Sequence, residues 1–230
     1  MEFEYYYNNV PNLGKVRNNL VYTSLINREK TIFLKWFHND TEYHKGRNQV
    51  IDPSLMRKKF DREVYFLRKL EKINSNLIPK IIKIDDLQQK IYFEIQGDDF
   101  WEKANCQETN YNKIVPDWQD QMLHILQLYR DLGWYKFSLH PSSYFIVNDK
   151  LKSINYFFTY ESNEPIVTLE EHRSHISLER QEKMKDIMAA LNIKWEDKIC
   201  YKKLQILCFE SFRSNYPNDF INSAIKIYAN

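Results

Sequence analysis

The residues best suited to chemistry gather in one stretch, residues 133–157, which reads GWYKFSLHPSSYFIVNDKLKSINYF. Ser138 and Ser142 stand two residues on either side of His140, and a serine next to a histidine can act as a nucleophile with its base. The stretch lacks the G-x-S-x-G context of such a serine. His140 could instead serve as a general base or hold the loop by hydrogen bonds, and we favour the second interpretation.

No metal site is predicted. His172 and His175 are spaced to share a helix face, but apart from Glu171 no acidic or thiol residue is set to complete a site. The three cysteines form no C-x-x-C pair and cannot all be paired in disulfides, so we expect buried free thiols. They are Cys106, Cys200 and Cys208.

The stretch 133–157 predicts a tight loop and then a β-hairpin, with strands at 144–147 and 151–157 joined by an Asn148-Asp149 turn. The same patterns predict the elements on either side of it. We expect strands at 20–26, 31–37, 78–84 and 90–96, helices at 53–72, 116–132, 178–191, 196–213 and 219–228, and an irregular segment at 158–176.

Composition narrows the classes of function. The 230 residues can bury a substantial core, and 43% hydrophobic with 28% charged residues is ordinary for a globular protein. A formal charge of +2 gives no support to nucleic-acid binding. No apolar run is long enough to span a bilayer, and the acidic N-terminus MEFEYYYNNV is unlike a signal peptide, so a cytoplasmic protein without membrane contact is expected.

Several motifs in the first half resemble those of the protein-kinase-like superfamily. LGKVRNNLV at 13–21 is similar to the glycine-rich loop LGxGxxGxV and keeps Gly14, but Val and Asn replace its other two glycines. IFLK resembles VAIK, which makes Lys35 the phosphate-binding lysine. FDREVYFLRKL at 60–70 matches the FxxExxxLxxL pattern of the αC helix, which makes Glu63 the partner of Lys35.

The resemblance also implies a two-lobed α+β fold. Phe93 would lie near the gatekeeper position, and Glu94 and Gln96 would belong to the hinge between the lobes. Residues 1–97 would form a small antiparallel-sheet N-lobe with one αC-type helix, and residues 98–230 a mainly helical C-lobe.

The stretch 133–157 resembles the kinase sequence GIVHRDLKPENLLL followed by KLKLIDFG, and its LHP motif at 139–141 is similar to that of small-molecule kinases. It departs from the family at the chemical positions. Ser138 stands where the catalytic aspartate belongs, Ser143 where the metal-binding asparagine belongs, and Asn155 where the DFG aspartate belongs.

These substitutions predict impaired catalysis. A serine cannot accept the substrate proton as a carboxylate can, and a positioned general base contributes roughly 10²–10⁴ in rate. Divalent cations prefer charged oxygen ligands, so Mg²⁺ binding is not expected and ATP binding would be weak.

The sequence therefore predicts a pseudokinase that binds or regulates a protein partner or a small molecule. The alternative is an atypical ATP-dependent phosphotransferase acting on a small molecule. A third is a structural partner protein whose cleft is filled by side chains such as Phe93, Tyr156 and Phe157.

Overall fold

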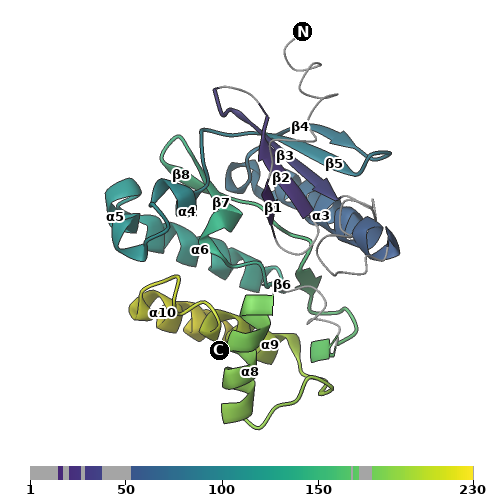
Figure 1. Cartoon of the computed structure of the whole chain (residues 1–230), viewed down its shortest axis with the longest axis vertical. Coiled ribbons are helices and arrows are strands. Elements are labelled where there is room, and N and C mark those ends of the chain that lie inside the picture. Colours follow the sequence, from purple (N-terminus) through teal and green to yellow (C-terminus); the bar gives the residue numbers. More distant parts are fainter. Residues whose placement is uncertain are drawn as a thin grey trace.

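The structure is a computed structural model that describes residues 15–17, 21–26, 29–37, 53–166, 168–170 and 178–229. Over these residues the chain has an α+β fold, with one five-stranded antiparallel sheet, two two-stranded sheets and seven α-helices. The large sheet lies at one end of the molecule and the helices nearest the C-terminus lie at the other (Figure 1). Within the described residues, no helix is long and apolar enough to cross a membrane.

The order of strands in the large sheet differs from their order in the chain. From edge to edge the strands are β1 (Lys15–Arg17), β2 (Val21–Leu25), β3 (Ile32–Phe37), β5 (Lys90–Glu94) and β4 (Lys80–Asp85). Because β5 lies between β3 and β4 in the sheet, the chain that leaves β3 has to cross the position of β5 before it reaches β4. It does so through helix α3 (Pro53–Asn74), which Figure 1 shows beside the strands, and the short 3₁₀ helix η3 (Ser75–Leu77).

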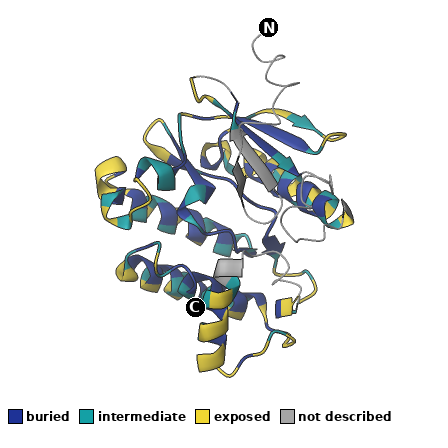
Figure 2. Cartoon of the chain, in the orientation of Figure 1, coloured by how far each residue is buried: buried dark blue, intermediate teal, exposed yellow. Residues whose placement is uncertain are grey.

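Helix α3 follows from its amphipathic pattern. Met56, Phe60 and Leu67 are separated by four and seven positions, that is by one and two helical turns, and are at most 1% exposed, whereas Asp61 and Arg68 face solvent. Figure 2 shows the helix as alternating buried and exposed stripes. The helix predicted at 53–72 is thus confirmed, and it continues to Asn74.

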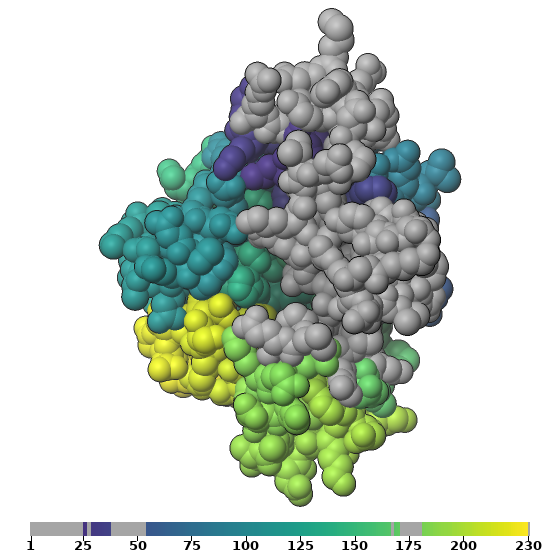
Figure 3. Space-filling model, viewed as in Figure 1, coloured from purple at the N-terminus to yellow at the C-terminus, as the bar shows by residue number. Residues whose placement is uncertain are grey.

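The rest of the described chain is mainly helical. Its helices are α4 (Phe100–Lys103), η4 (Glu108–Asn110), α5 (Tyr111–Ile114), α6 (Trp118–Asp131), η5 (Pro141–Ser143), α8 (Leu178–Ala190), α9 (Tyr201–Glu210) and α10 (Asn218–Ala229). The four short strands form two antiparallel pairs, β6 (Trp134–Lys136) with β9 (Thr159–Glu161) and β7 (Tyr144–Val147) with β8 (Lys150–Ser153). Figure 3 shows α8 at the end of the molecule opposite the sheet, with α10 near it.

Gly133 lets the chain turn from α6 directly into β6. Its φ is +71°, in the left-handed region that glycine adopts without strain. A Cβ at this position would lie 2.8 Å from Oγ of Ser162, so a larger residue would also push against the segment after β9. Gly133 is therefore required both by the backbone conformation of the turn and by close packing.

A single core joins the sheet to the helices. Phe93 and Ile95 from the sheet side belong to the same cluster of buried apolar side chains as Trp118, Tyr129 and Phe220 from the helices. All five are at most 2% exposed. Burial of large aromatic side chains contributes most of the stabilisation in such a core.

Most predicted elements are present, but four expectations about the second half and the cysteines were wrong. The second strand of the hairpin ends at Ser153 rather than 157, because Asn155 adopts a φ of +66°, which a strand cannot continue. The segment at 158–176, expected to be irregular, contains strand β9. Helix α9 begins at Tyr201 rather than 196, and Cys106 and Cys200 are exposed, so only Cys208 is a buried thiol.

Candidate functional site

The centre of the site is an ion pair between β3 and α3. Nζ of Lys35 lies 2.8 Å from Oε1 of Glu63, and both side chains are 0% exposed. Burial lowers the pKa of Lys35 to about 8, and the adjacent carboxylate of Glu63 opposes this effect. A buried pair of this kind costs desolvation energy, but removal of one partner costs more, because it leaves the other charge uncompensated.

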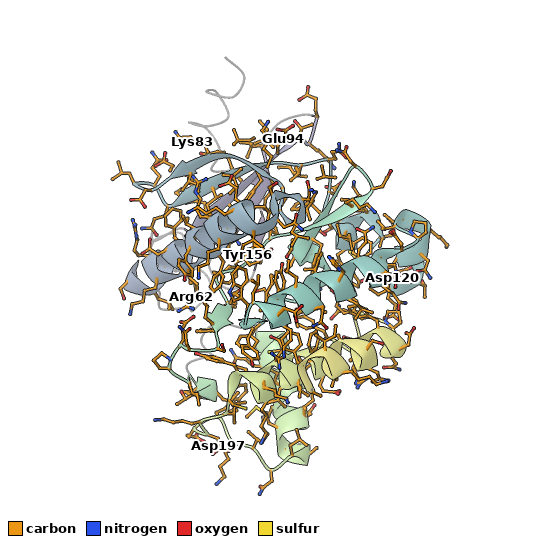
Figure 4. All side chains as sticks on the ribbon, turned by 180° about the vertical axis from the view of Figure 1, so that it is seen from behind. Arg62, Lys83, Glu94, Asp120, Tyr156 and Asp197 are labelled. Carbon is orange, nitrogen blue, oxygen red and sulfur yellow. The ribbon has the colours of Figure 1, made fainter. Side chains whose placement is uncertain are left out.

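The second carboxylate oxygen of Glu63 binds the segment that follows the hairpin. Oε2 accepts hydrogen bonds from the backbone N–H groups of Tyr156, at 2.5 Å, and Phe157, at 2.7 Å. One buried carboxylate therefore connects the sheet, helix α3 and residues 156–157. Figure 4 shows Tyr156 in the centre of the molecule, between α3 and α6.

Asn155 completes a chain of polar contacts with the ion pair. Its Oδ1 accepts a 2.6 Å hydrogen bond from Nζ of Lys35, and its Nδ2 donates a 2.9 Å hydrogen bond to Oγ of Ser143. Asparagine tolerates the left-handed backbone found here better than most residues. The amide oxygen that could bind a cation is thus already occupied by a lysine ammonium.

Ser138 lies near this chain of contacts but does not join it. It is 7% exposed, and within the described part of the chain its hydroxyl has no hydrogen-bond partner. Its carbonyl oxygen accepts a 2.5 Å hydrogen bond from Nζ of Lys136. No base is therefore in contact with the Ser138 hydroxyl among these residues.

Lys136 is a site residue that the sequence analysis missed. It is fully buried, its ammonium lies over the rings of Tyr144 and Tyr156 at 5.6 and 5.3 Å, and burial lowers its pKa to about 7. The sequence signal was the position of the lysine between aromatic and apolar residues in a strand with alternating burial. That pattern alone does not distinguish a buried from an exposed lysine.

His140 holds the loop together. It is the N-cap of η5, and its Nδ1 accepts a hydrogen bond from the backbone N–H of Ser142 at 3.2 Å and lies 2.8 Å from the Ser142 hydroxyl. Its ring packs against Trp101 and Phe212, with centroids 5.3 and 6.1 Å apart. The contacts are those of a capping side chain, and they use the nitrogen that a general base would need.

Aromatic rings fill the space between the sheet and the hairpin. The ring of Phe33 on β3 lies 4.8 Å from that of Phe145 on β7 and 6.3 Å from that of Phe93 on β5, measured between centroids. All three side chains are at most 6% exposed. A planar base cannot enter between Phe33 and Phe145 unless one of the rings moves.

The segment after β5 is hydrogen-bonded to the turn of the β7–β8 hairpin. Nε2 of Gln96 donates to Oδ1 of Asn148, and Oε1 of Gln96 accepts from the backbone N–H of Asn148, both at 2.9 Å. Glu94 is exposed and forms a 2.9 Å ion pair with Lys80. Gly14 and the pair His172 and His175 lie outside the described residues.

Helix α3 is also held to β9 and the turn after it by a clamp of charged residues that the sequence did not reveal. Arg62 donates to both carboxylate oxygens of Glu164, at 3.0 and 2.9 Å, and to the carbonyl oxygen of Thr159 at 2.8 Å. Lys69 lies 2.6 Å from Glu161. These contacts join residues more than 90 positions apart in the chain, so no local pattern could predict them.

Within the part of the chain that the structure describes, Lys59 is buried without a counter-charge. It is 2% exposed, and its Nζ has no hydrogen-bond partner among the described residues. Its Nζ lies over the rings of Phe157 and Phe158, 5.9 and 5.3 Å from their centroids, in the geometry of a cation–π contact. Burial lowers the pKa of Lys59 to about 8. Three lysines that are at most 2% exposed, Lys35, Lys59 and Lys136, thus lie in the same part of the described structure as the buried carboxylate of Glu63.

No metal ligand set is found where the structure can be described. Among these residues no group of three or more His, Cys, Asp or Glu side chains could hold a metal ion. Comparison of the chain with models of protein families finds no match, and comparison with curated proteins finds none either.

Proposed function

We propose that this chain is a catalytically impaired, protein-kinase-like domain that acts as a binding or regulatory module. The observation that carries the proposal is the chain of contacts from Glu63 through Lys35 and Asn155 to Ser143. These are the four positions at which the kinase resemblance would put the conserved ion pair and the two metal ligands. The ion pair is formed, but the residues at both metal positions are neutral and bound to protein groups.

The proposal includes the two-lobed arrangement, with an N-lobe over residues 1–97 and a C-lobe over 98–230. It is supported by the strand order β1-β2-β3-β5-β4 and by helix α3, which lies between β3 and β4 in the chain and supplies the carboxylate paired with Lys35. The hydrogen bond between Gln96, which follows β5, and Asn148 in the β7–β8 turn fits a hinge at this point of the chain.

Two further features support loss of phosphoryl transfer. Mg²⁺ normally neutralises the charge that develops on the transferred phosphoryl group, and a carboxylate ligand is needed to hold it. Asn155 offers no charge, and its oxygen already accepts from Lys35. In addition, the resemblance would put a nucleotide base between the sheet and the hairpin, where the rings of Phe33 and Phe145 are in contact, so weak or no nucleotide binding is expected.

The proposal is tested by titrating the purified chain with ATP in a calorimeter, with and without Mg²⁺. We expect no binding, or weak binding that Mg²⁺ does not strengthen. Magnesium-dependent hydrolysis of radiolabelled ATP that is lost in the Lys35→Ala variant would overturn the proposal, because it would assign turnover to this site.

A second candidate is an atypical phosphotransferase acting on a small molecule. The intact pair of Lys35 and Glu63 favours it, since such a pair is costly to keep without a use. This function predicts that ATP together with Mg²⁺ raises the melting temperature well above the value with ATP alone. An equal melting temperature in both conditions would count against it.

A further inference from the structure

A groove opens at the junction of three elements, away from the buried ion pair. It has a volume of about 680 Å³ and lies between the C-terminal end of α3 with η3, the first half of α6, and the β7–β8 hairpin. Binding sites for ligands and short peptide segments commonly fall between about 300 and 1,000 Å³. The groove is therefore large enough for one or two side chains of a partner.

The floor of the groove is apolar. Leu77 from η3, Ile125 from α6 and Leu151 from β8 line it, and each is at most 7% exposed. Because these three residues come from three different elements that are each fixed in the core, the floor is a preformed surface.

The hairpin side of the groove is fixed by one glutamine. Oε1 of Gln121 on α6 accepts a 2.8 Å hydrogen bond from the backbone N–H of Leu151, and its Nε2 donates to the carbonyl oxygen of Asp149 at 3.3 Å. A surface that is already ordered loses little conformational entropy on binding, which favours affinity.

The rim carries a cation without a carboxylate. Lys152 is partly buried and donates a hydrogen bond to the carbonyl oxygen of Asn76, but it forms no ion pair within the described residues, and burial lowers its pKa. Lys150 on the same strand is 63% exposed and stands 3.7 Å from Asp117. The β8 side of the groove therefore presents positive charge beside the apolar floor.

The α6 side of the groove carries an anion. Asp120 on α6 is exposed and has no partner among the residues that the structure describes. Figure 4 shows it at the surface, at the end of α6 far from Tyr156. The β8 and α6 sides of the groove thus carry opposite charges, which would favour one orientation of a bound segment.

We propose that this groove binds an extended segment of a partner protein in which an apolar residue is next to a carboxylate residue. The apolar side chain would cover Leu77, Ile125 and Leu151, and the carboxylate would pair with Lys152. The inference rests on the proposed function, since it assigns the surface through which a binding module without turnover recognises its partner. Such a segment matches both the apolar floor and the ammonium of Lys152, which forms no ion pair with any described residue.

The test begins with selection from a phage-displayed library of random peptides on the full chain. We expect the selected peptides to share an Asp or Glu beside a large apolar residue. A fluorescein-labelled peptide from this set is then titrated with the protein and its variants, and binding is followed by fluorescence anisotropy.

Two variants with opposite expected effects on affinity are compared, because a variant that misfolds could weaken binding but could not tighten it. Lys152→Gln removes the cation and should weaken binding about threefold, whereas Asp120→Lys removes a repulsive charge and should tighten it by a similar factor, the range for exposed ion pairs. Lys226→Gln on α10 makes the same charge change outside the groove and should have no effect.

Several outcomes would overturn the inference. They are failure to enrich any peptide, enrichment of peptides without carboxylates, and affinities that Lys152→Gln and Asp120→Lys leave unchanged. Self-association that Lys152→Gln abolishes would also overturn it, because the occupant would then be a second copy of the chain. The ATP titration is independent of all these, so turnover in the cleft would refute the proposed function without deciding what the groove binds.

Discussion

At the scale of single residues, the site contains one buried glutamate, Glu63, and three lysines that are at most 2% exposed. Lys35 is compensated by Glu63, Lys136 by a carbonyl oxygen and aromatic rings, and Lys59, among the residues that the structure describes, by aromatic rings only. A buried ammonium without a counter-charge destabilises the folded state, because burial disfavours its charged form. Lys59 is therefore the residue whose replacement should have the simplest effect.

We predict that Lys59→Met stabilises the protein at pH 7 by up to about 3 kcal/mol, the cost of lowering a lysine pKa from 10.5 to about 8. The unfolded chain holds this proton more tightly than the folded protein, so wild-type stability should rise with pH between about 8 and 10.5. The gain from the variant should shrink over the same range. Urea unfolding at a series of pH values measures both effects.

The matched control is Lys58→Met, because Lys58 is the exposed neighbour of Lys59 on the same helix. It should change stability little at any pH. Equal effects of the two variants would show that the burial of Lys59 is not the cause.

A second prediction concerns the ion pair itself. Lys35→Met should destabilise the protein by about 3–5 kcal/mol, since it leaves the Glu63 carboxylate buried without a counter-charge. The double variant Lys35→Met with Glu63→Gln should recover much of this loss, because it removes both charges and keeps an oxygen for the N–H groups of Tyr156 and Phe157. Thermal and urea unfolding of the wild type, both single variants and the double variant complete the cycle. Simple additivity of the two single effects would contradict the prediction.

At the scale of elements, helix α3 is held on two sides by the same segment. Inside, Glu63 accepts the backbone N–H groups of residues 156–157, and outside, Arg62 and Lys69 pair with Glu164 and Glu161. The position of the buried ion pair therefore depends on strand β9, which is itself fixed to β6. Movement of α3 away from residues 156–164 would require all of these contacts to break together.

We predict that Glu161→Gln destabilises the protein by about 1 kcal/mol. Its carboxylate accepts hydrogen bonds from Lys69 and from the indole of Trp134, and the acid is only 22% exposed, so its contacts are less screened than those of an ordinary surface pair. Glu71→Gln breaks the exposed pair with Arg68 on the same helix and should cost close to nothing. Urea unfolding distinguishes the two, and equal losses would refute a special role of the clamp.

At the scale of the whole molecule, the sheet and the helices share one core. The ring of Phe33 on the sheet contacts that of Phe145, and Glu63 accepts hydrogen bonds from backbone groups that belong to the second half of the chain. Each half would therefore expose apolar side chains or unpaired backbone groups if it stood alone. The two halves should unfold in one cooperative transition.

The corresponding prediction is that a fragment of residues 98–230 does not fold alone. Without the sheet and α3 it would expose Phe145 and Phe157, which are 2% exposed in the whole chain, and would leave two buried N–H groups without an acceptor. A two-dimensional NMR spectrum of the labelled fragment should show poor dispersion, with the full chain as the control. A well-dispersed spectrum of the fragment would contradict the prediction.

Much of the described architecture was predictable from the order of residues alone. Helix α3 and the hairpin of β7 and β8 follow from apolar spacing and from an Asn-Asp turn, which are local properties. The same local signals missed β9 and extended the second hairpin strand past Ser153, since a three-residue strand and a left-handed asparagine leave little trace in a pattern of periodicity.

What the sequence by itself determined is the set of residue types at the site: a lysine, a glutamate, serines and an asparagine. What only the tertiary structure decided is how these residues are used. Oδ1 of Asn155 accepts a hydrogen bond from Lys35, and His140 caps the short helix η5 of its own loop. The ring of Phe33 packs against that of Phe145, which belongs to the other half of the chain. The reason is physical: the burial of a charge and the partner of a side chain depend on residues that are distant in sequence, and a local pattern contains no information about them.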